Sequence, residues 1–174
     1  MIFSGTIAYA DNLDFERDIA PQKEDMQQVI AYLKKSPTAT KLLDKFEKYK
    51  NILVRIPKKF VGDSFEPIEI QDNTLSGYIV WDPHQAIFFY GSNREKEYIS
   101  SALLYIHEVN HAINYLEDTK NYTDRRAILN KDYDDNEEMQ TIKVERTIAR
   151  ELGEPERVSH HGRIQYTDSV VDHS

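Results

Sequence analysis

Two histidines four residues apart, His107 and His111, lie within a stretch of apolar residues at helical spacing. Positions i and i+4 of a helix share one face, one turn apart, so both imidazoles can bind a single zinc ion. Glu108 follows the first histidine, where its carboxylate can lie beside the open position of the metal and accept a proton from water. The apolar turns over residues 99–106 predict that this helix is buried. We therefore predict a zinc site inside the fold, on a helix that spans about residues 95–117.

A catalytic zinc site needs a third protein ligand. In one class of zinc peptidases a histidine fills this role six positions after the second one, where this chain has Glu117. A better source is the pair Glu137 and Glu138, which opens the next predicted helix and can reach across to the first. One glutamate would bind the metal while the other orients a histidine. Alternatively, both carboxylates only interact with the positive N-terminus of their helix and bind no metal.

The composition narrows the class of protein. The chain of 174 residues has no cysteine, so its fold depends on an apolar core, and thiolate zinc ligands and a cysteine nucleophile are excluded. A net charge of −8 repels phosphate backbones, so we expect no nucleic acid partner. No apolar run approaches about 18 residues, so we expect no membrane span. The N-terminus lacks a secretory signal, which predicts a protein that works in a cytosol or leaves its cell without a cleaved signal.

The hydrophobic pattern predicts one α+β domain over residues 1–174, with a small antiparallel sheet packed on the helix that carries His107. It would comprise N-terminal helices and a strand (1–60), a metal-binding core (66–157) and an irregular tail (158–174). Helices are predicted over residues 26–33, from 36–37 to about 49, over 95–117 and from 134–136 to 152. Strands are predicted over residues 2–8, 52–57, 67–70, 76–81 and 86–90, with a hairpin turn at 82–85.

Local signals predict where two of these helices begin and end. Ser36 followed by Pro37 is a good N-cap with proline at the first helical position. One of the residues 134–136 can cap the last helix, and Gly153 ends it. Residues 118–135 are polar and form either a lid over the substrate or a solvated connection.

Peptide hydrolysis also needs a group that stabilises the oxyanion beside the metal. Arg157 is the plainest candidate because its guanidinium keeps its charge, and Tyr166 could donate a phenolic hydrogen bond. The tail offers further candidates in His160, His161 and Arg163. The alternative is that the paired histidines near the C-terminus are surface residues.

Residues 77–157 resemble the NleD-type effector zinc metalloproteases that pathogenic bacteria inject into host cells and, more distantly, the catalytic chains of clostridial neurotoxins. The resemblance rests on residues 77–83 (GYIVWDP), the His107 motif, residues 137–141 (EEMQT) and residues 150–157 (RELGEPER). It implies a zincin-like fold, Glu138 as the third ligand, and a protein substrate in the cytosol of a target cell, such as a signalling kinase. Gln140 stands where the family usually has arginine, and residues 158–161 (VSHH) stand where it often has tyrosine, which leaves the oxyanion stabiliser open.

Three functions are compatible with these residues. The first is a zinc-dependent endopeptidase that acts in a target cell, and the second is a housekeeping metallopeptidase that stays in its own cell. The third is a zinc-binding interaction protein without hydrolytic activity, which Glu108 argues against because a structural site has no use for a general base. In a peptidase we expect an extended substrate to pair with the strand at 76–81 or 86–90, while residues 118–135 close over it.

Overall fold

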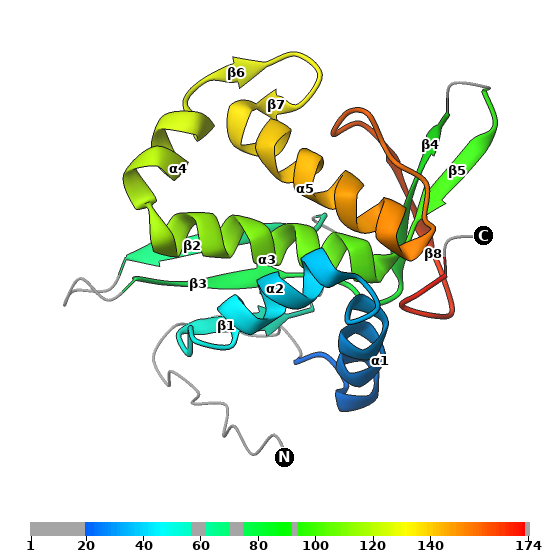
Figure 1. Ribbon diagram of the computed structural model, residues 1–174, viewed down its shortest axis with the longest axis horizontal. Coiled ribbons are helices and arrows are strands. Elements are labelled where there is room, and N and C mark those ends of the chain that lie inside the picture. The colour runs from blue at the N-terminus through cyan, green and yellow to red at the C-terminus, as the bar shows by residue number, and fades with distance from the viewer. Residues whose placement is uncertain (1–19, 57–61, 70–74, 92–93, 173–174) are drawn as a thin grey trace.

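Helix α3 (Ser101–Glu117) lies at the centre of the structure, and the other helices and several strands pack against it (Figure 1). The computed structural model describes residues 20–56, 62–69, 75–91 and 94–172. Over these residues the chain forms a single α+β domain, as the order of helical and extended segments predicts. None of the helices in these ranges has the length and apolar character needed to cross a lipid bilayer. The strand predicted over residues 2–8 lies outside the described residues.

The central helix is buried along most of its length, with every residue over 101–113 shielded from solvent. Apolar side chains such as Leu103 and Ile106 anchor it in the core, as predicted. The predicted start at residue 95 is wrong, because β5 (Lys96–Ile99) pairs there with its neighbouring strand. The helix begins after Ser100, whose Oγ accepts a hydrogen bond from Leu103 N.

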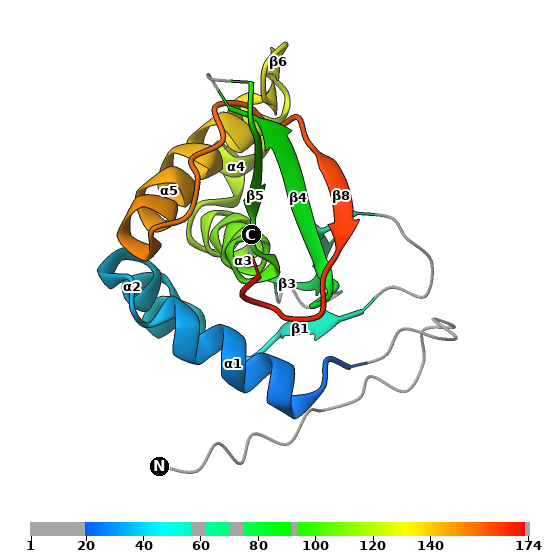
Figure 2. The same cartoon turned by 90° about the vertical axis from the view of Figure 1, so that its right-hand side faces the viewer.

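Two three-stranded sheets replace the single antiparallel sheet that the sequence predicts. The first has the order β1-β3-β2 and consists of β1 (Ile52–Arg55), β2 (Ser64–Glu69) and β3 (Leu75–Val80), with β1 parallel and β2 antiparallel to β3. The second is antiparallel, has the order β5-β4-β8 and adds β4 (Gln85–Tyr90) and β8 (Arg163–Tyr166). The tail is therefore not irregular throughout. Figure 2 looks along α3 and shows β4 and β8 on the side of that helix opposite α5.

The chain turns at residues 82–85 as predicted, but the turn does not form a hairpin. Asp82 redirects the chain, since its carboxylate accepts hydrogen bonds from His84 N and Gln85 Nε2. The strands on either side, β3 and β4, belong to different sheets, and each is the central strand of its sheet. Neither therefore has the free edge that the sequence-based prediction requires for pairing with a substrate.

The capping signals near the N-terminus are confirmed. Helix α1 (Lys23–Leu33) leads to Ser36, and the Oγ of this serine accepts a hydrogen bond from Ala39 N at 2.9 Å to start α2 (Pro37–Phe46). The stretch over 118–135 is not an open loop, because it contains α4 (Thr119–Arg126) and two short strands, β6 (Leu129–Asn130) and β7 (Asp134–Asp135).

The last helix, α5 (Asn136–Leu152), packs directly against α3. Asp135 caps it, with one carboxylate oxygen accepting hydrogen bonds from Glu137 N and Glu138 N. Gly153 ends it with a left-handed φ of 78°, a conformation that favours glycine.

Glu154 ties the end of α5 to the start of α3. Its buried carboxylate accepts hydrogen bonds from Ser100 N at 2.8 Å and Ser100 Oγ at 2.7 Å. Tyr32 of α1 donates its hydroxyl to the same carboxylate at 2.8 Å. One side chain therefore fixes the angle between three helices, and with it the placement of the residues on α3 and α5 that face each other.

We expect Glu154→Ala to lower the free energy of unfolding by about 2–4 kcal/mol, because it leaves three buried donors without an acceptor. Glu117→Ala is the control, because Glu117 forms an exposed ion pair with Lys45 at 3.1 Å, and loss of such a pair costs less than about 1 kcal/mol. Urea unfolding measures both variants. Equal losses would contradict the role given to Glu154.

Candidate metal centre

The facing surfaces of α3 and α5 bring three predicted ligands together. His107 Nε2 and His111 Nε2 lie 3.1 Å apart, and each lies 3.1 Å from Glu138 Oε2. Two ligand atoms on a tetrahedral zinc ion, with bonds of about 2.1 Å, are about 3.4 Å apart. The three atoms therefore form a triangle of the size that one zinc ion can bridge. All three side chains are buried.

Each histidine uses its second nitrogen to contact a glutamate on α5. His107 Nδ1 donates to Glu145 Oε2 at 2.8 Å, and His111 Nδ1 contacts Glu137 Oε1 at 3.2 Å. A carboxylate on Nδ1 fixes the ring orientation and leaves Nε2 free to bind a metal. The geometry thus separates the two neighbouring glutamates: Glu138 faces both Nε2 atoms, whereas Glu137 orients one ring.

Glu145 is a residue of the site that sequence reasoning missed. It lies seven residues after Glu138, two turns along the same face of α5, and this spacing is the signal that could have identified it. Arg157 holds it in a bidentate ion pair, with contacts of 2.6 and 2.7 Å. Burial would raise the pKa of Glu145, but the charge of Arg157 and the hydrogen bond from His107 lower it to about 2.

The structure places the two predicted oxyanion stabilisers differently. Arg157 is buried beside His107, with Nη2 at 3.4 Å from Nδ1 of that ring, and its contacts to Glu145 make it a positioning residue. Its Nη1 is buried without a hydrogen-bond partner among the described residues. Tyr166 lies on β8 with 66% of its surface exposed, and no side-chain contact in the described residues joins it to the triangle.

His160 approaches the triangle from the tail. Its Nε2 lies 3.5 Å from Glu138 Oε2, and its ring stacks on that of His107 with centroids 5.9 Å apart. The ligand atoms of His107, Glu138 and His160 all lie within 4.8 Å of one another, a spacing at which they could hold a metal ion. His161 instead points to Lys131 O at 3.3 Å.

Glu108, the residue after His107 on α3, is buried, with 6% of its surface exposed. Its charge acts on both histidines of the triangle. It also acts on Asp63, a carboxyl group just before β2 that the sequence does not single out: burial and the charge of Glu108 raise the pKa of Asp63 to about 7. The site therefore places two carboxyl groups close enough to interact electrostatically.

Helix α4 supplies cations to the site. Arg125 Nε donates to Glu137, and Arg126 Nη1 donates to Glu138 Oε1 at 2.7 Å. Tyr122 is buried against the ring of His111. The charges of Arg125 and Arg126 thereby compensate the buried glutamates of α5.

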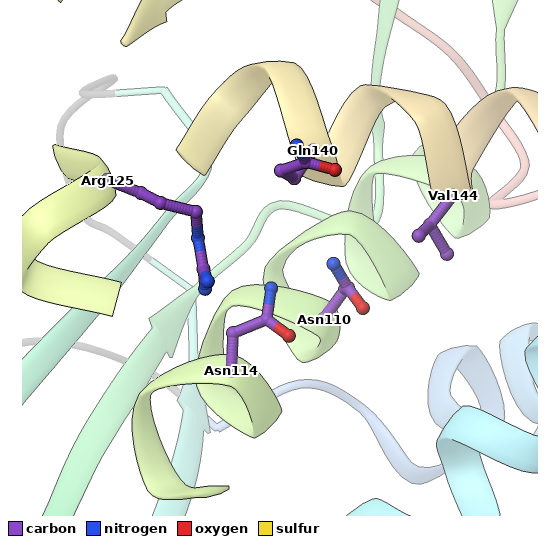
Figure 3. Close-up of a pocket in the computed structure, with 5 residues that line it drawn as sticks. All are labelled: Asn110, Asn114, Arg125, Gln140 and Val144. Atoms are coloured by element: carbon purple, nitrogen blue, oxygen red, sulfur yellow. The ribbon is translucent and has the colours of Figure 1, made fainter. Parts of the chain in front are cut away.

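A pocket of about 300 Å³ opens beside Glu137, between α3, α4 and α5. Figure 3 shows the amides of Asn110 and Asn114 rising from α3 toward Gln140 on α5, with Arg125 reaching in from α4 and Val144 completing the wall. Asn114 and Arg125 both donate to Glu137. The pocket thus borders the groups that orient His111.

Comparison of the chain with protein-family models, curated proteins and solved structures gave no match. The resemblance to NleD-type metalloproteases accordingly stays a prediction.

We expect Glu138→Gln to reduce zinc affinity more than Glu137→Gln, because only Glu138 faces both Nε2 atoms. Glu137→Gln removes a partner of a ligand, a change that typically costs about 10–100-fold in affinity. Titration of the metal-free proteins with zinc in competition with a chelating dye measures both. The reverse order would assign the metal to Glu137.

Without metal, stability should depend on pH through the two histidines. Burial opposes their charge, but hydrogen bonds to Glu137 and Glu138 raise the pKa of His111 to about 10, and those to Glu138 and Glu145 raise the pKa of His107 above 6.5. The folded protein therefore keeps protons that the unfolded chain releases above pH 6.5.

The resulting stabilisation is complete below pH 6.5 and is lost as the pH rises toward about 10, by up to about 1.4 kcal/mol per pH unit for each proton. Urea unfolding of chelator-treated protein at several pH values measures this loss. The double variant His107→Gln, His111→Gln should show a flatter dependence. A stability that increases across this range would contradict the assigned hydrogen bonds.

Proposed function

We propose that the protein is a zinc-dependent endopeptidase. The observation that carries the proposal is the convergence of His107 Nε2, His111 Nε2 and Glu138 Oε2 at 3.1 Å from one another, with the buried carboxylate of Glu108 close enough to act electrostatically on both histidines. Two imidazoles and one carboxylate are a ligand set used by catalytic zinc in hydrolases.

The donor set suits zinc rather than magnesium or calcium, which prefer sites made of oxygen atoms. When bound, zinc lowers the pKa of a coordinated water and polarises a carbonyl oxygen. Glu108 is the residue of the chain that would accept the proton of the attacking water and pass it to the leaving nitrogen. A purely structural site would not need this carboxylate.

The remaining side chains hold the ligands in place. Glu145 and Arg157 fix His107, while Glu137 and its partners on α3 and α4 fix His111. Burial opposes ionisation of Glu138, but hydrogen bonds from His107 and His111 keep its pKa well below the usual range. Glu138 is therefore charged and ready to bind a cation at any ordinary pH.

Strand β2 offers an edge for an extended substrate. Within the described residues it pairs with β3 on one side only, it contacts α3, and Asp63 at its start interacts with Glu108. Main-chain pairing along this edge would bind a peptide with little sequence preference. We assign substrate binding to β2 in place of the strands at 76–81 and 86–90.

The proposal extends to the place of action only through the resemblance described above. By this resemblance, the substrate would be a protein in the cytosol of a target cell, such as a signalling kinase. A housekeeping peptidase within the producing cell is the alternative. Mapping new protein termini in a target-cell lysate, with and without the zinc-loaded protein, distinguishes a narrow substrate range from a broad one.

We expect Glu108→Gln to keep zinc and to lower the rate of peptide hydrolysis by about 10²–10⁴-fold, because only the general base is lost. Chelation should abolish hydrolysis by the unsubstituted protein, and added zinc should restore it. Cleavage of an unfolded protein such as casein measures the rate, and Glu117→Gln on the same helix is the control. Full activity in Glu108→Gln would end the proposal.

A further inference from the structure

We infer that His160 is a fourth protein ligand of the metal, so that residues 158–162 close the centre until a substrate displaces them. This inference rests on the zinc site of the proposed function. It concerns the resting state of that site, whereas hydrolysis requires an open position on the metal.

The three histidines of the cluster share one arrangement. Each points Nδ1 at a carboxylate: His107 at Glu145 (2.8 Å), His111 at Glu137 (3.2 Å) and His160 at Asp134 (2.6 Å). Each points Nε2 at the same oxygen, Glu138 Oε2, at 3.1, 3.1 and 3.5 Å respectively. A histidine held in this way by a carboxylate is the usual form of a metal ligand.

The distance from His160 to Glu138 fits a fourth vertex. Ligand atoms on a tetrahedral zinc ion lie about 3.4 Å apart, close to the 3.5 Å between His160 Nε2 and Glu138 Oε2. The ring of His160 lies almost parallel to that of His107, at an angle of 19°. The ligand atoms of His107, Glu138 and His160 lie within 4.8 Å of one another, so His160 stands next to the triangle of the other three ligands.

Asp134 holds the ring of His160 through Nδ1 and leaves Nε2 directed at Glu138. A neutral imidazole held in this way has a lone pair on Nε2 that can bind a metal.

The segment that carries His160 is held at both ends and from one side. Arg157 is buried before it, and β8 begins at Arg163 after it. His160 N donates to Asp132 O at 3.0 Å, within the turn between β6 and β7 that leads into α5. The side chain of His160 stays partly exposed, at 33%, so it can leave the site without disturbing the core.

Binding of zinc and cobalt to the full chain tests the inference. We expect His160→Ala to lower zinc affinity by more than the roughly 10–100-fold that loss of an outer partner costs, and to alter the visible absorption of the cobalt-loaded protein. Asp134→Asn should lower the affinity by about 10–100-fold, since asparagine tolerates the φ of 66° at this position. His161→Ala is the matched control and should change neither measurement.

Three results test the inference. Unchanged zinc affinity and cobalt absorption in His160→Ala, with circular dichroism showing the native fold, would overturn the inference. Unchanged metal binding with lost hydrolysis would also overturn it and make His160 a transition-state donor. We expect the zinc-saturated variant to hydrolyse a generic peptide at least as fast as the unsubstituted protein, because its metal has an open position.

Failure of the proposed function gives a different pattern. The zinc-loaded protein would then hydrolyse nothing, with or without His160→Ala, while this substitution would still weaken metal binding. That pattern would identify a closed zinc site without peptidase activity. An unsubstituted chain that binds neither zinc nor cobalt would overturn both the site and the inference.

Discussion

The rest of the structure depends on the contact between the histidines of α3 and the glutamates of α5. His107 and His111 face Glu137, Glu138 and Glu145 across a buried interface. Carboxylates and imidazoles removed from water are costly unless each one is paired. Two helices can bury such groups only if their polar atoms match, so this interface fixes the rotation and register of both helices.

The demand for compensating charge explains features that lie outside the interface. The glutamates form ion pairs with arginines from two separate segments: Arg125 and Arg126 from α4, and Arg157 from the chain after α5. A polar stretch of sequence thereby becomes helix α4, folded against the site. After Arg157 the tail continues to β8, which pairs with β4. The charges of the candidate metal centre therefore also determine which side chains surround it.

The sequence predicts the parts of this arrangement that follow local rules. The buried helix, the caps at Ser36 and near Asp135, and the candidate ligands at fixed spacing were accessible from periodicity and residue type. The spacing of Glu145 after Glu138 also carries a signal, but it does not identify the partner Arg157, and β8 could not be predicted, because both depend on which distant segment the chain brings alongside. The turn at 82–85 carries the right residues for a hairpin, yet strand pairing is decided by the whole sheet.

The short segment between Arg157 and β8 has a consequence for how readily His160 returns to the centre. A side chain anchored on both sides cannot diffuse away, so His160 meets the centre at a high effective concentration. A peptide in solution would have to outcompete this tethered imidazole, and weakly bound peptides would rarely do so. In the proposed peptidase the tail would therefore act as a threshold on affinity, which would protect bystander proteins from cleavage without any pocket that recognises their side chains.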